Sequence, residues 1–384
     1  MKEKTLKIAL VHDYLRDFGG AERVLFVLSE MYPEAPIHTA FFSKNSPAYE
    51  VFKGKIIKES PLAPLIKTWR LYSPLRFLLP LIWGSIDLSS YDLVITSTSN
   101  YIARGFKTGE NTIVIAYCHT PPRFLYGLKT GFDWKKHILV RIYGHIVAHF
   151  LRMYDFETAQ NINHWVANSN NVAQRIEKFY RKSSVVIYPP VNVNEIIKVS
   201  KNTKPQNYFL IVARLVGSKG IEEAVLAANK LKISLKIVGE AEGFTSVRDH
   251  LKSIGEKNVE FLGRVPDDKL WKLYGEAKGF IALARDEDFG MTVVEAQAAG
   301  TPVIAFNGGG FKESVVEGET GILINDTDEE TIRKALVRFN KIKWNKKVIQ
   351  NNAKRFSQEV FEQKIQSFVK ESMLKYAHAR TPRG

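Results

Sequence analysis

Short apolar runs alternate with helix-length segments along nearly the whole chain, and this alternation limits the possible folds more than any other feature. The first run, Leu6–His12 (LKIALVH), has the length and the mainly apolar character of a buried parallel strand. The segment after it repeats apolar residues with a period of 3.6, which is typical of a helix. Such alternation predicts an α/β fold built on doubly wound parallel sheets.

The other strand candidates continue this pattern through both halves of the chain. They are Pro36–Phe41, Asp92–Thr96, Thr112–Ala116 and His164–Ala167, then a run ending near Ala213, followed by 235–239, 259–265 and 279–284. The Lys- and Glu-rich segment from Thr327 to about Tyr376 has helical spacing and predicts three further helices.

A chain of 384 residues exceeds what one hydrophobic core usually supports, so two domains are expected. The stretch 184–195 (SVVIYPPVNVNE) and the polar residues after it interrupt the alternation and indicate the junction. We expect one domain at residues 1–185 and a second at 186–358. Residues 359–384 should form a helix that packs back on the first domain and ends in a disordered tail, HARTPRG.

The formal net charge of +15 indicates an anionic partner. No zinc-ligand spacing, aromatic RNA-binding signature or basic heptad region is present, so we expect no nucleic-acid partner. The N-terminus has no apolar signal region, and no apolar run is long enough to span a bilayer. The single cysteine, Cys118, fits a reducing compartment. We therefore expect a cytoplasmic protein.

Residues 51–86 are unusual because six Lys or Arg residues, with one acidic residue, are interleaved with aromatic and aliphatic side chains. This composition suits a surface in the headgroup region of an anionic membrane. The same segment could instead be a pair of helices that covers a sheet edge, with its lysines merely solvated. The sequence leaves both interpretations open, and the first would place the protein peripherally at the inner face of the cell membrane.

Two loops in the first half could meet a ligand. Gly19-Gly20 lies between a strand and a helix, where backbone amides and the helix dipole can approach an anion. His119 follows the strand Thr112–Ala116 and should face the crevice at the carboxyl end of the sheet. Each loop also has a purely structural interpretation. The glycines could serve only a tight turn, and the histidine could be a structural hydrogen-bond partner.

Two loops in the second half carry charged residues at strand ends. Arg214 and Lys219 flank a glycine turn, and two such cations could clamp a diphosphate. Glu287 and Glu295 lie eight positions apart, and a helix beginning near Met291 would leave Glu287 in the preceding loop. A solvated loop and an ordinary strand–loop–helix corner are the alternatives.

Several motifs of the second half occur together in one order: LKIVG, VEFLGRVPDDKLWKLY, EDFGMTVVEA, GTPVIA, GGG followed by ESV, and GETGIL. In this order they resemble the C-terminal domain of the family 4 retaining glycosyltransferases. The first half resembles the same family more weakly, through GGAE and HTPPR. The resemblance implies the GT-B architecture, in which two facing Rossmann-like domains hold the active site in the cleft between them. The first domain would then be the acceptor side, and the second would bind the nucleotide sugar.

The resemblance also implies a role for particular residues. Glu287 would contact the donor sugar near its reacting face, and His119 would shape the reacting site. The remaining donor-binding positions would be Gly19, Gly20, Arg214, Lys219, Arg264, Val265, Phe289, Gly290, Met291, Thr292 and Glu295. Among them Glu295 would bind the ribose, and the base would be met near Arg264 and Val265.

These assignments imply a hexosyltransferase that moves mannose, glucose or a related sugar from a GDP- or UDP-sugar to a lipid-linked or polysaccharide acceptor. No D-x-D motif suited to holding a divalent ion is present, which agrees with the metal independence that the resemblance implies, so we expect neither a metal nor another cofactor. A glycosidase pair of carboxylates would leave Arg214 and Lys219 without a purpose. Two alternatives are a nucleotide-sugar epimerase of the same architecture and a non-catalytic subunit that binds glycan or membrane.

Overall fold

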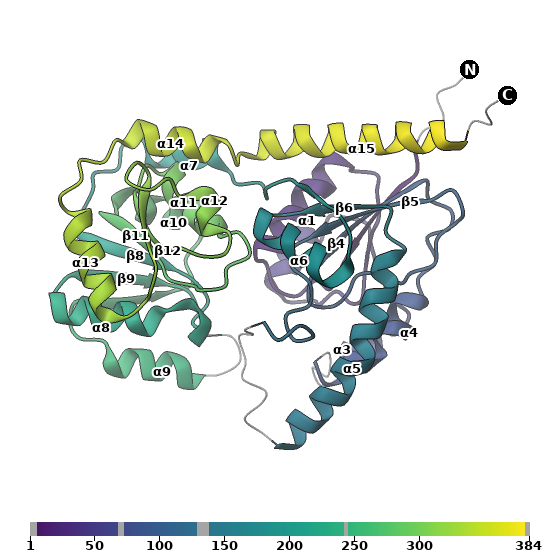
Figure 1. Ribbon diagram of the computed structural model, residues 1–384, viewed down its shortest axis with the longest axis horizontal. Coiled ribbons are helices and arrows are strands. Elements are labelled where there is room, and N and C mark those ends of the chain that lie inside the picture. The colour runs from purple at the N-terminus through teal and green to yellow at the C-terminus, as the bar shows by residue number, and fades with distance from the viewer. Residues whose placement is uncertain (1–5, 68–72, 129–137, 242–244, 381–384) are drawn as a thin grey trace. The chain divides into compact units, whose positions relative to one another are not determined.

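The computed structural model describes residues 6–67, 73–128, 138–241 and 245–380 (Figure 1). The chain divides into two units. The first runs to Pro190 and also takes in the chain from Phe361 onward, and the second runs from Val191 to Val360. Each unit has its own parallel sheet, so the predicted α/β fold is confirmed.

The sheet of the first unit has the strand order β3-β2-β1-β4-β5-β6-β7. The strands are β1 (Ile8–His12), β2 (Ile37–Thr39), β3 (Ile57–Glu59), β4 (Leu93–Thr98), β5 (Ile113–Cys118), β6 (His164–Ala167) and β7 (Val185–Val186). From β1 the order runs outward in one direction to β3 and in the other to β7. Such a reversal is the switch point at which open α/β sheets bind ligands beyond the carboxyl ends of their strands.

Helices cover both faces of this sheet. They are α1 (Gly20–Met31), α2 (Pro47–Phe52), α3 (Ala63–Lys67), η2 (Pro74–Leu78), α4 (Leu79–Gly84), α5 (Ile138–Gln160), α6 (Asn170–Tyr180) and α15 (Gln358–Arg380). One buried cluster joins α1, α2 and α15 to alternate strand residues such as Leu10 and Ile95. A second joins α3, α4, α5 and α6 to the residues between them, such as Val11 and Val94. This alternation follows from the two-residue period of a strand.

Residues 51–86 contribute to the second of these clusters, through buried side chains that include Ile66, Ile82 and Trp83. The Trp83 indole donates a hydrogen bond to the Tyr101 carbonyl at 2.8 Å. The segment therefore covers the sheet, as the alternative interpretation of its sequence required. It also adds β3, whose three residues were too few to stand out as a strand in the sequence.

The sheet of the second unit has the order β10-β9-β8-β11-β12-β13, with its switch point between β8 and β11. The strands are β8 (Tyr208–Val212), β9 (Ser234–Val238), β10 (Val259–Gly263), β11 (Gly279–Ala282), β12 (Val303–Phe306) and β13 (Gly321–Ile324). The helical segments are α7 (Val193–Ser200), η4 (Gly217–Lys219), α8 (Ile221–Leu231), α9 (Thr245–Ile254), α10 (Asp267–Glu276), α11 (Met291–Ala298), α12 (Phe311–Ser314), α13 (Glu329–Phe339) and α14 (Lys346–Lys354).

The three helices predicted after Thr327 are present as α13, α14 and α15. Phe361, Ile365 and Val369 of α15 lie in the core of the first unit. The predicted disordered tail is wrong for its first residues, because α15 continues to Arg380. Residues 381–384 of that tail lie outside the described part of the chain.

Candidate functional site

Two loops of the second unit meet at its switch point. Lys219 ends the short turn after β8, and Glu287 lies in the loop after β11, 68 residues along the chain. The Lys219 Nζ atom lies 2.6 Å from the Glu287 Oε2 atom, and the two side chains are 23% and 22% exposed. They meet because β8 and β11 are adjacent parallel strands, whose carboxyl ends share one edge of the sheet. Both residues thus lie beyond the carboxyl ends of adjacent strands, and their contact with a ligand stays a prediction.

Glycines allow these loops to approach so closely. Gly220 has a φ of +66°, and a Cβ atom at this position would lie 2.6 Å from the Cβ atom of Leu283, just after β11. A Cβ atom on Gly310 would lie 2.3 Å from the Phe289 Cα atom. The Gly310 amide donates a hydrogen bond to the Glu287 carbonyl at 3.0 Å. The loops after β8, β11 and β12 therefore pack as one assembly around Glu287.

The helix predicted near Met291 begins at that residue, as α11. Gly290 is its N-cap, with a φ of +90° and no side chain to cap the first turn. The early amides of a helix have no partner within the helix and carry partial positive charge, so Met291 and Thr292 begin an anion-attracting end. The Phe289 ring is buried against Phe356, with ring centroids 5.4 Å apart, so its side chain anchors the loop.

Glu295 lies one turn into α11 and is buried. Its Oε2 atom accepts a hydrogen bond from the Tyr274 hydroxyl of α10 at 2.9 Å. Tyr274 is fully buried and therefore fixes the direction of the carboxylate. Nothing in the local sequence around Glu295 indicated this tyrosine, because it reaches the site from the preceding helix.

The remaining predicted positions of this unit lie at strand ends. Arg214 follows β8 and is exposed, on the other side of Gly217 from Lys219. Arg264 is exposed and Val265 half-buried after β10, the outermost strand, which is separated from β8 by β9. The Gly239 amide donates to the Gly263 carbonyl at 2.9 Å and so connects the loops after β9 and β10.

The first unit has a connected set of polar side chains at its own switch point. His12 ends β1, Ser97 lies opposite it on β4, and His119 follows β5. The Ser97 hydroxyl oxygen lies 3.0 Å from His12 Nδ1 and 2.8 Å from His119 Nε2. His119 is therefore buried in a hydrogen-bonded network. Of these three residues, only His119 was predicted from the sequence as a site residue.

Glu22 continues this network on the other side of His12. Its Oε1 atom lies 3.5 Å from His12 Nε2, and its Oε2 atom accepts a hydrogen bond from the Gly19 amide at 2.8 Å. Gly19 is the N-cap of α1, and Gly20 begins that helix. The predicted Gly19-Gly20 turn thus connects to His119 through Glu22, His12 and Ser97. Glu22 is the last residue of the GGAE motif, and this motif is the one feature of the local sequence that could have indicated it as a site residue.

Burial shapes the protonation of this network. Burial, together with a smaller contribution from the charge of nearby His12, lowers the pKa of His119 from 6.5 to about 3. For Glu22, burial alone would raise the pKa, but the hydrogen bond and charge of His12 and the Gly19 amide outweigh it and lower the pKa. His119 is accordingly neutral and Glu22 ionised at neutral pH.

An ionised Glu22 can only accept hydrogen bonds, so His12 carries a proton on the Nε2 atom that faces it. His12 Nδ1 and His119 Nε2 both contact the Ser97 hydroxyl, which can donate to one ring and accept from the other. Because Ser97 contacts His119 through Nε2, Nδ1 is the ring nitrogen of His119 that could meet a ligand.

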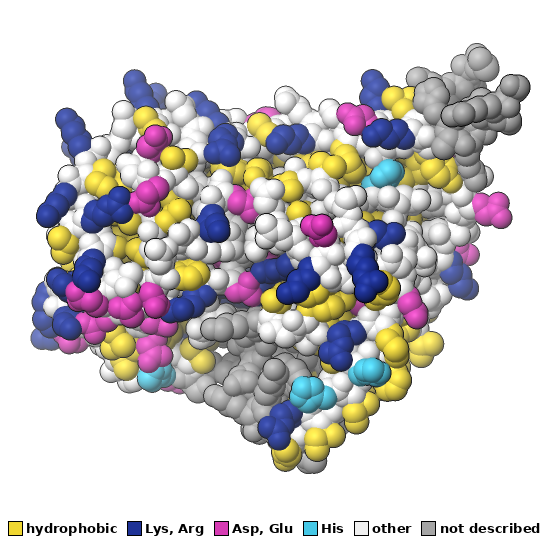
Figure 2. Space-filling view, viewed as in Figure 1, with side chains coloured by type: hydrophobic (Ala, Val, Ile, Leu, Met, Phe, Trp, Pro, Cys, Tyr) yellow, Lys and Arg dark blue, Asp and Glu magenta, His cyan; other side chains and the backbone are white. Residues whose placement is uncertain are grey.

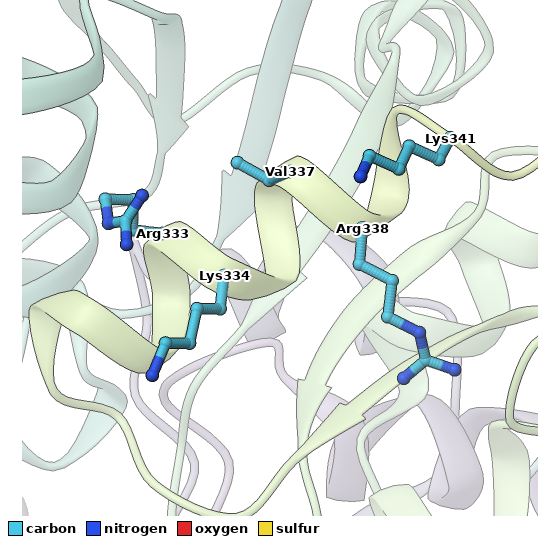
Figure 3. Close-up of a pocket in the computed structure, with 5 residues that line it drawn as sticks. All are labelled: Arg333, Lys334, Val337, Arg338 and Lys341. Carbon is cyan, nitrogen blue, oxygen red and sulfur yellow. The ribbon is translucent and has the colours of Figure 1, made fainter.

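A separate hollow lies against α13. Figure 3 shows its lining side chains, Arg333, Lys334, Val337, Arg338 and Lys341, projecting from this helix and the residues just after it. Three of these cations are paired with glutamates. Glu330 lies 2.7 Å from Arg333 and 3.6 Å from Lys334. Glu317 lies 2.6 Å from Arg338. None of the lining residues belongs to the loops that carry Lys219 and Glu287. Within the described ranges, no three His, Cys, Asp or Glu side chains are grouped closely enough to hold a metal ion.

Two family descriptions match consecutive parts of the chain. Residues 18–195 match "Glycosyltransferase Family 4", and residues 192–356 match "Glycosyl transferases group 1". An uncharacterized glycosyltransferase of Methanocaldococcus jannaschii is 25% identical over 191 residues, which are 50% of this chain and 53% of that protein. The alignment thus spans about half the length of that relative.

Two longer matches extend over most of the chain. The α-1,3/1,6-mannosyltransferase ALG2 of Dictyostelium discoideum is 26% identical over 331 residues, covering 73% of this chain and 75% of that protein. The crystal structure of HepE from Anabaena with UDP and glucose has a TM-score of 0.67 at 19% identity and covers 95% of this chain and 99% of that one. The GT-B fold class and the order of motifs agree with these matches, and the chain belongs to glycosyltransferase family 4.

Proposed function

We propose that the protein is a retaining hexosyltransferase that moves mannose, glucose or a related sugar from a GDP- or UDP-sugar to a lipid-linked or polysaccharide acceptor. The observation that carries this proposal is the Lys219–Glu287 pair at the switch point of the second sheet. The names of two relatives support the donor classes. ALG2 is called a mannosyltransferase, and HepE was crystallised with UDP and with UDP-glucose.

Departure of a nucleoside diphosphate builds negative charge on its β-phosphate. We assign stabilisation of this charge to Lys219, Arg214 and the first amides of α11 at Gly290, Met291 and Thr292. These groups are fixed before the reaction, since Lys219 is held by Glu287 and the α11 loop by the glycines against it. The proposal therefore requires no metal and no other cofactor.

Glu287 has two roles in this scheme. It orients the Lys219 ammonium group, and its second carboxylate oxygen contacts the hydroxyls of the donor sugar. Glu295, held by Tyr274, binds the ribose, and the base is met near Arg264 and Val265. The two carboxylates thus bind different parts of one donor and do not form an acid/base pair.

His119 acts on the sugar as a neutral hydrogen-bonding group. Its lowered pKa keeps the ring uncharged at neutral pH, and since Ser97 contacts Nε2, we assign the contact with the sugar to Nδ1. In the transfer step the bond between the anomeric carbon and the β-phosphate oxygen breaks, and a bond to the acceptor oxygen forms on the same face. The departing phosphate takes the proton of the acceptor hydroxyl, so no protein base is assigned.

The test compares Lys219→Ala with Lys334→Ala, a control that removes a lysine exposed on α13. Charge-assisted hydrogen bonds contribute about 1.5–3 kcal/mol, so Lys219→Ala should weaken binding of a nucleoside diphosphate by about tenfold to a hundredfold. Binding of the nucleoside alone should not change. Calorimetry measures both affinities after a thermal-shift screen of UDP-, GDP- and ADP-sugars has identified the base.

The same variants are then assayed for transfer of radiolabelled sugar to bacterial lipid extracts and polysaccharide. Transfer should fall with Lys219→Ala and persist with Lys334→Ala. Equal losses of nucleoside and diphosphate binding would refute the clamp. Absence of transfer across the whole donor panel would refute the transferase proposal, and conversion of the donor without an acceptor would favour an epimerase.

A further inference from the structure

The outer face of α5 in the first unit is an exposed apolar stripe. Its members are Ile142, Ile146, Phe150 and Met153, which are 52%, 55%, 61% and 47% exposed. Their spacing of three or four residues places them on one side of the helix. The opposite side, with Ala148, Leu151 and Asp155, is buried against the unit. In a helix already packed on its inner side, this outward stripe has no role in the core.

Neighbouring elements extend the stripe. The Tyr143 hydroxyl donates a hydrogen bond to the carbonyl of Pro74 in η2, so α5 and η2 lie side by side. Phe77 of η2 and Leu81 of α4 are 49% and 62% exposed. Figure 2 shows hydrophobic side chains gathered along the edge of the molecule where α5 lies, interspersed with Lys, Arg and His.

The polar side chains beside the stripe are mainly basic. Arg141, His145, His149 and Arg152 are exposed on the same helix. Of the acidic residues of α5, Asp155 is buried in an ion pair with Arg104, and Glu157 is exposed just beyond Met153. The polar side chains that border the apolar stripe therefore favour an anionic partner.

We propose that the outer face of α5, with Phe77 and Leu81 beside it, docks the protein on the surface of an anionic lipid bilayer. A helix that lies in the interface buries its apolar face among the acyl chains and places its basic side chains among the headgroups. No helix in the described part of the chain is long and apolar enough to cross a membrane, so α5 lies on the surface rather than spanning it. A second copy of the chain fits less well, since pairing two α5 faces would bring Arg141 and Arg152 of both copies together.

This docking surface differs from the one expected from residues 51–86 alone. The side chains of that segment that include Ile66, Ile82 and Trp83 are buried in the core, and its cations Lys55 and Lys67 pair with Glu30 and Glu59. From its described residues, Phe77 and Leu81 contribute to the surface. The inference does not depend on the proposed transfer reaction, because vesicle binding needs neither donor nor acceptor, and either proposal can fail alone.

The test measures cosedimentation of the protein with vesicles of phosphatidylglycerol and phosphatidylcholine in equal parts. The double variant Ile146→Glu/Phe150→Glu should lose at least about tenfold in vesicle affinity, because two large apolar side chains no longer insert. Leu374→Glu is the matched control, since Leu374 is 51% exposed on α15 of the same unit. It should bind like the unaltered protein, and all three proteins should have the same melting temperature.

Vesicles of phosphatidylcholine alone should bind several-fold more weakly, because each basic residue near an anionic surface contributes about 1 kcal/mol. Equal affinities of the double variant and Leu374→Glu would overturn the proposal, and so would the absence of binding by the unaltered protein. Sedimentation velocity without lipid provides the remaining outcome. Self-association that only the double variant abolishes, without vesicle binding, would assign the face to a second copy and overturn the membrane proposal.

Discussion

The switch points of the two sheets carry different chemistry. In the second unit, a lysine and a glutamate of opposite charge meet with about a fifth of each side chain exposed. In the first, His12, Ser97 and His119 are buried and connect inward to Glu22. Both sites lie beyond the carboxyl ends of parallel strands, so topology alone does not set this difference.

The difference indicates what each site can do. A partly exposed ion pair has a smaller desolvation penalty than a fully buried one, and Lys219 can share its charge between Glu287 and a phosphate. A buried network does not readily gain a charge, but its hydrogen bonds hold the His119 ring in one orientation. The second unit is thus suited to binding an anion, and the first to presenting a fixed neutral imidazole.

The largest expected effect tests how the charged site is built. Gly310→Ala would place a Cβ atom 2.3 Å from the Phe289 Cα atom and 2.6 Å from the Asp288 carbonyl oxygen, so the loop that carries Glu287 must move. Overpacking of this kind costs about 1–3 kcal/mol or more, and we expect a lower melting temperature together with weaker nucleoside diphosphate binding.

Gly217→Ala is the matched control, because a Cβ atom there meets nothing within 4 Å although the residue lies beside Lys219. Melting curves and calorimetry measure both variants. If Gly310→Ala behaved like Gly217→Ala, close packing of the loops would not be what positions Glu287.

A smaller effect is expected from the buried network. Ser97→Ala removes the hydroxyl that lies 3.0 Å from His12 and 2.8 Å from His119, and leaves two buried ring nitrogens without this partner. The cost should be about 1–3 kcal/mol of stability, with nucleoside diphosphate affinity unchanged since Lys219 belongs to the other unit. Ser253→Ala, which removes an exposed hydroxyl on α9, is the control for thermal melting. Identical melting of the two variants would show that the network contributes nothing.

A further effect depends on pH. His119 has a pKa of about 3 in the folded protein and an ordinary value of 6.5 when unfolded, so between these values only the unfolded chain binds the proton. Its contribution to stability is therefore complete above pH 6.5 and is lost as the pH falls toward 3, by up to about 1.4 kcal/mol per pH unit.

His119→Asn removes this contribution. Urea unfolding at a series of pH values should give a shallower decline in stability for the variant below pH 6.5 than for the unaltered protein. Parallel declines would mean that His119 is protonated in the folded state, and the contrast between a neutral and a charged site would be lost.

The sequence was sufficient to predict which helix start, loop or turn a particular residue occupies. The helix start at Met291, the loop position of Glu287 and the Gly19-Gly20 turn all depend on local spacing and on glycine, which act over a few residues. The N-cap of α6 is an equally local feature, since the Ser169 hydroxyl accepts a hydrogen bond from the Val172 amide at 3.1 Å. The tail was misjudged because its polar composition does not show that α15 is already anchored on the first unit by Phe361, Ile365 and Val369.

The residues that these side chains contact could not be predicted from the sequence. Lys219 and Glu287 are 68 positions apart, Ser97 and His12 are 85 apart, and Tyr274 reaches Glu295 from another helix. Strand order decides which loops become neighbours, and a local pattern does not contain it. The sequence by itself determined the α/β class and the residue types at the strand ends, because hydrophobic periodicity and glycine conformations are local. Only the tertiary structure decided which of them touch, which are buried and which apolar face of α5 remains uncovered, because adjacency and desolvation arise when distant segments pack together.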